Sequence, residues 1–240
     1  MVLESMMISV RNLSVDYMEF SRTRFSPLGK MRRIKGIRGI SFSVNEGDII
    51  ALIGKNGAGK STLLKTTAGQ LRPSDGKILT KGRVILLSGS DPGFFHDSTG
   101  RQNISELGRA YGVKSEDLEE FSKSIFDFAS LGDAIDRNVR GYSTGMRGKL
   151  GFGFMTALSP ELLLIDETLG VGDAEFRKKA QERLRGFIES SRSVIISTHS
   201  LGLAREICNR GLVLDAGRLV FDGGIEDALS KYRSIVGQDN

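Results

Sequence analysis

The segment IIALIGKNGAGKS, residues 49–61, decides the fold. Its first five residues are apolar and predict a buried strand, and a glycine-rich stretch follows them directly. Residues 54–61 match the pattern G-x-x-x-x-G-K-[ST], and the sequence GKSTLLKTTAGQL from Gly59 onward predicts a helix. Strand, loop and helix therefore follow one another in the order that a phosphate-binding loop requires.

Small residues suit this loop because the backbone itself is the expected ligand. Glycines let successive N–H groups point at phosphate oxygens, and the positive end of the following helix adds to the attraction. Lys60 can reach the β- and γ-phosphates, and the Ser61 hydroxyl can bind Mg²⁺. The predicted nucleotide-binding residues of the loop are Gly54, Asn56, Gly57, Ala58, Gly59, Lys60, Ser61 and Thr62.

Three further residues follow buried strands. In ELLLIDE, residues 161–167, an apolar run typical of a parallel sheet ends in two acids. Asp166 is predicted to hold Mg²⁺ directly or through water, and Glu167 to polarise an attacking water. His199 ends the strand sequence VIISTH, where a histidine can sense the γ-phosphate.

Composition indicates an ordinary globular protein. The 240 residues are 39% hydrophobic and 26% charged, and no apolar run approaches the roughly eighteen residues of a membrane span. The N-terminal residues lack a basic-then-apolar signal pattern, so we expect the protein to stay in the cytosol. The single cysteine, Cys208, fits a reducing compartment and is expected to be a small buried hydrophobe.

Elsewhere the chain alternates between strand and helix patterns, which favours an α/β core. Short strands are predicted at 7–10, 40–44 and 84–87, and a hairpin around Ala216 and Gly217. Between about 99 and 158 the spacing becomes helical, with apolar residues recurring every three or four positions: Leu118, Phe121, Ile125 and Phe128. This stretch is interpreted as a helical insert of about 60 residues.

The net charge of +5 is unevenly distributed. Residues 22–38, RTRFSPLGKMRRIKGIR, hold seven basic residues and no acidic one. A solvated loop and a segment lying near lipid headgroups are both compatible with this pattern. Aromatic residues do not alternate with the basic ones as a base-stacking platform requires, so we do not expect nucleic acid as a partner.

With these motifs in place, the sequence resembles the ATP-binding-cassette (ABC) ATPases over nearly all of its length. YSTGM, residues 142–146, stands about twenty residues before Asp166, where that family carries its signature, and implies that Ser143 and Gly145 contact nucleotide. Asp173 matches the D-loop aspartate and His199 the switch histidine. Tyr17 matches the aromatic residue that stacks on adenine, although a plain strand tyrosine fits as well.

The resemblance implies a single ABC ATPase domain over 1–240. Residues 1–98 and 159–240 would form the phosphate-loop NTPase core with an antiparallel β subdomain, and 99–158 the inserted α-helical signature subdomain. ATP and Mg²⁺ are the implied cofactors. In this family two subunits bind two ATP molecules head to tail, so each phosphate loop would face Ser143 and Gly145 of the other chain.

YSTGM, LGVGD and DSTGRQNI most resemble the ATPase subunits of bacterial polysaccharide exporters, which move O-antigen, capsule, teichoic acid or similar lipid-linked glycans. That branch implies a homodimer docked on two copies of a membrane permease, peripheral to the cytoplasmic face of the bacterial inner membrane. The chain stops soon after the predicted hairpin, so we do not expect it to bind the glycan directly.

Two departures from the family pattern affect the site. The usual glutamine after the strand at 84–87 is missing, and Ser90 is the nearest equivalent by spacing, while Gln102 is expected in the helical insert. Thr144 replaces a signature glycine, which restricts that turn.

Other functions remain as alternatives. An ABC ATPase for a drug, lipid or peptide is compatible with the motifs, and a soluble ABC ATPase acting on DNA or the ribosome is less so, because the chain has one cassette and one cysteine. The signature and His199 argue against a phosphate-loop kinase. The lack of an N-K-x-D motif argues against a GTPase.

Overall fold

A computed structural model describes residues 5–23, 26–88, 91–166 and 174–237. The described residues fall into two compact units, one drawn from the ranges 1–86, 160–167 and 191–240, the other from 87–159 and 168–190. None of the helices in this described part of the chain combines the length and hydropathy that a membrane span needs.

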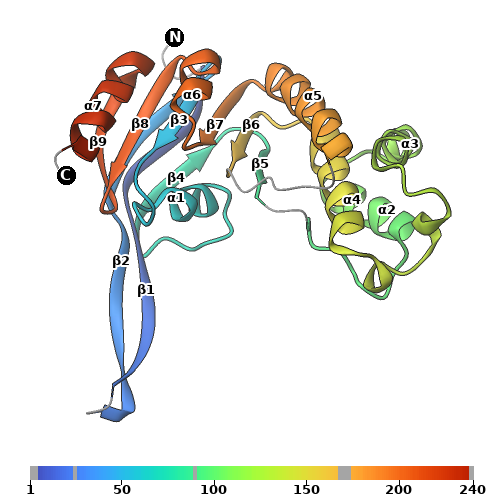
Figure 1. Ribbon diagram of the computed structural model, residues 1–240, viewed down its shortest axis with the longest axis horizontal. Helices are drawn as coiled ribbons and strands as arrows, with labels where there is room; N and C mark the ends of the chain where they lie inside the picture. Colours follow the sequence, from blue (N-terminus) through green and yellow to red (C-terminus); the bar gives the residue numbers. More distant parts are fainter. Residues whose placement is uncertain (1–4, 24–25, 89–90, 167–173, 238–240) are drawn as a thin grey trace. The chain divides into compact units, whose positions relative to one another are not determined.

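The first unit is built on a six-stranded sheet with the order β5-β6-β7-β3-β8-β9 (Figure 1). Its strands are β3 (Ile49–Ile53), β5 (Val84–Leu87), β6 (Leu162–Ile165), β7 (Ser193–Ser197), β8 (Arg210–Asp215) and β9 (Arg218–Gly224). β3 pairs in parallel with β7 and β8, and β6 with β7, while β9 turns back antiparallel on β8. Every residue of β6 and β7 is buried, as expected for parallel strands covered on both faces.

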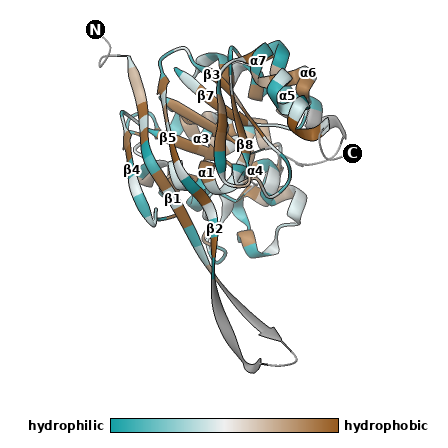
Figure 2. Ribbon diagram, turned by 90° about the vertical axis from the view of Figure 1, so that its left-hand side faces the viewer, coloured by the Kyte–Doolittle hydropathy of each residue, from teal (hydrophilic) through white to brown (hydrophobic). Residues whose placement is uncertain are grey.

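The helices α1 (Lys60–Thr67), α6 (Leu201–Ile207) and α7 (Ile225–Gly237) complete this part of the unit. Figure 2 shows hydrophobic residues concentrated along β7, β3 and β8. The predicted strands at 49–53, 84–87, 161–167 and 194–199 and the hairpin around Ala216 are therefore confirmed, with bounds within a few residues.

A second, antiparallel sheet has the order β2-β1-β4 and contains β1 (Met6–Thr23), β2 (Ser26–Asn45) and β4 (Asp75–Thr80). The predicted strands at 7–10 and 40–44 were too short. The interpretation of the basic segment, residues 22–38, as a solvated loop was also wrong, because its described residues lie in β1 and β2. β1 and β2 pair from Met6↔Asn45 to Thr23↔Ser26, and Figure 1 shows this ribbon running beyond the rest of the unit.

The sequence hid the long ribbon because its basic residues interrupt the apolar alternation from which strands are usually recognised. The pair Val15↔Ile37 lies in the hydrophobic core, and the pair Tyr17↔Ile34 continues the ladder beyond it. Cross-strand hydrogen bonding and such β-branched and aromatic pairs stabilise a ribbon even where charged residues lie between them.

One hydrophobic core joins the two sheets. It contains Ile8, Leu13, Ile37 and Ile40 from the antiparallel sheet, Leu52, Leu164 and Leu212 from the central sheet, and Leu63 and Leu64 from α1. Beside this core, the Arg210 guanidinium donates hydrogen bonds to Asp222 of β9, to Asp48 before β3 and to the carbonyl oxygen of Ser43 in β2. These partners, Asp222 foremost, raise the pKa of Arg210, so its charge is stabilised where three strands meet.

The second unit is helical and contains α2 (Gly100–Ala110), α3 (Leu118–Ala129), α4 (Thr144–Ala157) and α5 (Ala174–Ser190), with short 3₁₀ turns at Gly132–Asp136 and Val139–Gly141. α2 begins in a capping box, in which the Thr99 hydroxyl accepts from the Gln102 amide and the Gln102 side chain accepts from the Thr99 amide. Phenylalanines from α3, α4 and α5 form the aromatic centre of the unit, with ring centroids 5.1–6.4 Å apart among Phe128, Phe152 and Phe176.

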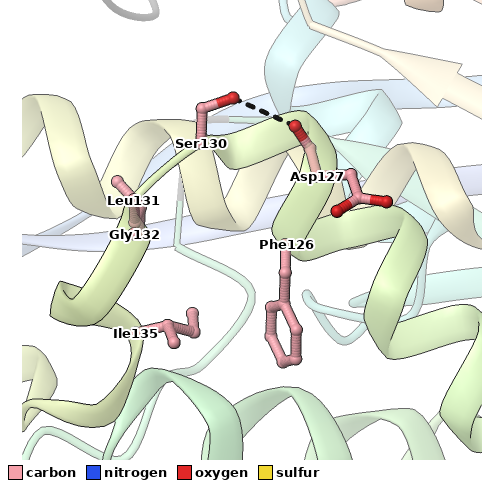
Figure 3. Close-up of a pocket in the computed structure, with 6 residues that line it drawn as sticks. All are labelled: Phe126, Asp127, Ser130, Leu131, Gly132 and Ile135. Carbon is pink, nitrogen blue, oxygen red and sulfur yellow. Dashed lines mark hydrogen bonds between the residues drawn. The ribbon is translucent and has the colours of Figure 1, made fainter.

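A cavity of about 380 Å³ opens on this helical unit (Figure 3). Its lining residues are Phe126, Asp127, Ser130, Leu131, Gly132 and Ile135. The Ser130 hydroxyl donates to the Asp127 carbonyl oxygen over 3.0 Å, which closes the end of α3 at one side of the opening. No residue predicted to bind nucleotide lines this cavity.

Cys208 is only 6% exposed, as predicted from composition. Burial raises the pKa of its thiol to about 12, so the side chain stays a neutral thiol at physiological pH and behaves as a small hydrophobe.

Candidate functional site

The candidate site begins in the loop between β3 and α1. Gly57 and Gly59 have φ angles of 80° and 106°, a left-handed conformation that glycine adopts without strain. Gly54 has no room for a side chain, because a Cβ there would lie 2.5 Å from the carbonyl oxygen of Leu214. The loop is therefore lined by backbone, as the motif predicted.

Lys60 is the first residue of α1 and is 8% exposed. Its Nζ donates to the carbonyl oxygens of Gly54 at 2.6 Å and of Lys55 at 3.2 Å, which holds the ammonium inside the curve of the loop. Ser61 and Thr62 occupy the first turn of α1, where backbone N–H groups have no intrahelical acceptor. A buried cation and a helix N-terminus thus lie together in one loop, which is the arrangement that binds a phosphate chain.

Two of the predicted strand-end residues lie at the same edge of the central sheet. Asp166 directly follows β6 and is 8% exposed, and His199 lies two residues after β7 and is exposed. β7 pairs in parallel with both β6 and β3, so the carboxyl ends of all three strands, and the glycine-rich loop after β3, meet at this edge. Glu167, Asp173 and Ser90 lie outside the described residues.

Ser61 and Asp166 fit Mg²⁺ by the chemistry of their donor atoms. A hydroxyl and a single carboxylate, completed by waters and phosphate oxygens, are a typical ligand set for this ion. Among the described residues, no three His, Cys, Asp or Glu side chains gather into a metal site.

Tyr17 lies in β1 and reaches the first turn of α1. Its hydroxyl donates to the Thr62 Oγ1 over 2.9 Å, and the side chain is 38% exposed. The structure therefore brings Tyr17 to the phosphate loop, a contact between residues 45 positions apart that sequence reasoning did not foresee.

The signature residues lie in the helical unit, at the N-terminus of α4. Ser143 is the N-cap, and its hydroxyl accepts from the Met146 amide over 3.2 Å. Ser143 is exposed, Gly145 is partly exposed, and Thr144 opens the helix. The preceding Tyr142 is buried, and its hydroxyl donates to the Ala134 carbonyl oxygen over 2.6 Å, which anchors the turn. An exposed helix N-terminus with its amides facing outward is suited to contact an anion.

The missing glutamine is not replaced by Gln102. Its side chain is engaged in the capping box of α2, as the prediction that it belongs to the helical insert requires.

The sheet order, the glycine-rich loop and the acid-ended strand define a phosphate-loop nucleotide-binding protein. The chain belongs to the ABC transporter family, whose sequence model matches residues 37–170. It is 35% identical over 217 residues to an O-antigen export system ATP-binding protein, RfbB, of Klebsiella pneumoniae, covering 90% of this chain and 88% of that protein. It is 33% identical over 211 residues to the ABC transporter protein AbcA of Aeromonas salmonicida, covering 88% of this chain and 68% of the relative.

Solved structures share the fold. The ATP-binding subunit of an ABC transporter superposes with a TM-score of 0.73 at 23% identity and covers 96% of this chain and 93% of its own. An ATP-binding cassette solved as a dimer in a post-hydrolysis state with ADP and Pi superposes with a TM-score of 0.69 at 16% identity. The match covers 91% of this chain and 99% of the chain in that structure. The fold is therefore an ABC ATPase fold, with an antiparallel β subdomain and an inserted helical subdomain, as the sequence predicted.

Proposed function

We propose that this chain binds and hydrolyses ATP to power the export of a lipid-linked polysaccharide, such as O-antigen, capsule or teichoic acid. The observation that carries the proposal is the 35% identity to an O-antigen export ATP-binding protein over 90% of the chain. The phosphate loop with its buried Lys60 supports the ATP-binding part of the proposal independently.

Each predicted site residue has a role in this proposal. The amides of residues 57–62 and the Lys60 ammonium hold the phosphates, and Tyr17 contacts the base. Ser61 and Asp166 hold Mg²⁺, which neutralises charge on the transferred phosphoryl group. Glu167 polarises the attacking water, and His199 contacts the γ-phosphate.

The proposed active form is a homodimer. Ser143 and Gly145 at the exposed start of α4 would supply amides to the ATP held by the other subunit, together with Asp173. Two copies of a separate membrane subunit complete the exporter, and the chain would lie on the cytoplasmic side of the bacterial inner membrane. The glycan itself would be handled by the membrane subunit.

The glycan assignment is tested in the cell that encodes the chain. A Glu167→Gln variant should trap the exporter, so lipid-linked polysaccharide should accumulate on the cytosolic leaflet while the surface amount falls. The Glu189→Gln variant, which alters an exposed acid of α5, is the matched control. Normal glycan on both leaflets would leave the ATPase in place and remove polysaccharide as its substrate, in favour of another exported compound.

We also propose that the β1–β2 ribbon contacts the membrane subunit or the lipid headgroups. From Tyr17 to Thr23 it extends roughly 20 Å at about 3.3 Å for each residue. Arg33 and Lys35 are exposed near its base, and Arg33 forms an ion pair with Asp16. Basic residues at an anionic surface contribute about 1 kcal/mol each and are screened by salt.

Neutralising Arg32, Arg33 and Lys35 to Gln should therefore release the protein from membranes, more strongly at low than at high ionic strength. Fractionation of cell lysates measures the effect. A control that neutralises the exposed residues Lys77, Lys231 and Arg233 removes the same charge from β4 and α7. Equal release by both triple variants would show that total charge, rather than the ribbon, directs the association.

A further inference from the structure

The base of the β1–β2 ribbon contains a β-bulge next to the phosphate loop. Val15 pairs with Ile37 and Asp16 with Lys35, so Gly36 is the extra residue on β2, opposite no residue of its own. A bulge bends its strand and redirects the neighbouring side chains, and bulges are common beside functional sites. The side chain that lies against this bulge is Tyr17 of β1.

Gly36 leaves just enough space for the Tyr17 ring. A Cβ on Gly36 would lie 2.7 Å from Cε2 and 3.2 Å from Cδ2 of Tyr17, and 3.4 Å from Cγ2 of Thr62. The ring therefore packs directly against the Gly36 backbone, while its hydroxyl is held by Thr62 at 2.9 Å. Two fixed contacts set the ring's position, and 38% of the side chain remains exposed for a ligand.

The carbonyl group of Gly36 contacts the phosphate loop itself. Its oxygen would lie 2.8 Å from a Cβ on Gly59 and 2.7 Å from a Cβ on Gly217, so three glycine backbones meet without side chains between them. The Gly217 amide donates to the Ala58 carbonyl oxygen over 3.0 Å, and the Arg38 amide donates to the Gly217 carbonyl oxygen over 2.8 Å. One residue thus fixes both the ring and the backbone of the loop.

We propose that Gly36 is a positioning residue for nucleotide binding, which sets the Tyr17 ring at the distance from the phosphate loop that a purine base requires. This inference rests on the proposed function, because it names the part of the site that reads the base. Gly36 does not adopt a left-handed φ, so its backbone conformation is compatible with alanine. A Gly36→Ala substitution would therefore act through the clash between the new Cβ and the Tyr17 ring.

The test compares a ligand that has a base with one that has none. Isothermal titration calorimetry of the full chain measures the Kd of Mg²⁺-ATP and of Mg²⁺-tripolyphosphate. Gly36→Ala should weaken ATP binding by about tenfold, the cost of one lost base–aromatic stack, and should change tripolyphosphate binding by less than about twofold. Gly186→Ala is the control, because its Cβ would enter open space on α5.

A double-mutant cycle shows whether Gly36 acts through the ring. In a Tyr17→Ala background the space is open again, so adding Gly36→Ala should fold normally and cost no further ATP affinity. Additive losses, or wild-type ATP affinity in Gly36→Ala, would overturn the positioning role. Failure of the wild-type chain to bind either ligand would instead overturn the proposed function.

Discussion

Glu167→Gln should slow ATP hydrolysis by about 10²- to 10⁴-fold, the range for loss of a general base, while ATP binds with unchanged affinity. Glutamine keeps the size of the side chain and loses the negative charge that polarises water. Lys60, the loop amides and the Mg²⁺ ligands are untouched, so the ground-state complex keeps its contacts. Phosphate release measures the rate, and calorimetry measures the binding.

The same variant should form a stable dimer in ATP, because the nucleotide is held between subunits without being cleaved. Gel filtration with and without ATP measures this, and the Glu189→Gln variant should hydrolyse ATP and behave as wild type. A Glu167→Gln protein that turns over ATP at the wild-type rate would disprove the assignment of the base. A protein that stays monomeric in ATP would count against the proposed homodimer.

Lys60→Ala should weaken ATP binding by about ten- to a hundredfold, since a hydrogen bond to a charged group contributes about 1.5–3 kcal/mol. The Lys60 ammonium is buried in the loop and is held by the Gly54 and Lys55 carbonyl oxygens, so its charge is already placed for phosphate. Calorimetry with ATP and with tripolyphosphate should show the loss for both ligands, which distinguishes it from the base-specific loss in Gly36→Ala.

Lys65→Ala is the matched control, because Lys65 lies in the same helix and is exposed. It should bind both ligands like wild type. A thermal melt of Lys60→Ala verifies the fold, since removing the ammonium also removes two hydrogen bonds to the loop. Equal affinities for Lys60→Ala and Lys65→Ala would rule out the direct phosphate contact.

The parts of the fold that were predictable are those with a local signal. The glycine-rich loop, the buried strands that end at Asp166 and near His199, and the helical spacing around Ile125 each depend on a few neighbouring residues. The positions of the glycine-rich loop, Asp166 and His199 at one edge of the sheet follow from parallel strand order. The signature at the start of α4 was recognised by resemblance, and its helix N-terminus agrees with that expectation.

The rest depends on contacts between distant residues. The length of the β1–β2 ribbon is set by pairing across its two strands, and charged residues on β2 concealed it. The Tyr17–Thr62 bond joins positions 45 apart, and the meeting of Gly36, Gly59 and Gly217 requires three separate segments to fold together. A glycine in IKGIR or DAGR carries no sign in the sequence that it touches the phosphate loop. The grouping of α5 with α3 and α4 likewise arises from ring and cation contacts, such as Lys179 over Phe128.

The three-glycine contact at the base of the ribbon has a thermodynamic consequence. Backbones packed directly on one another have no flexible side chain to absorb a displacement, so a shift of the ribbon base is a shift of the phosphate loop. A partner that displaced the ribbon base would therefore change the affinity for ATP. By reciprocity, ATP would change the affinity of the ribbon for that partner by the same factor. A docking event at the ribbon and the occupancy of the loop would thereby share one coupling free energy.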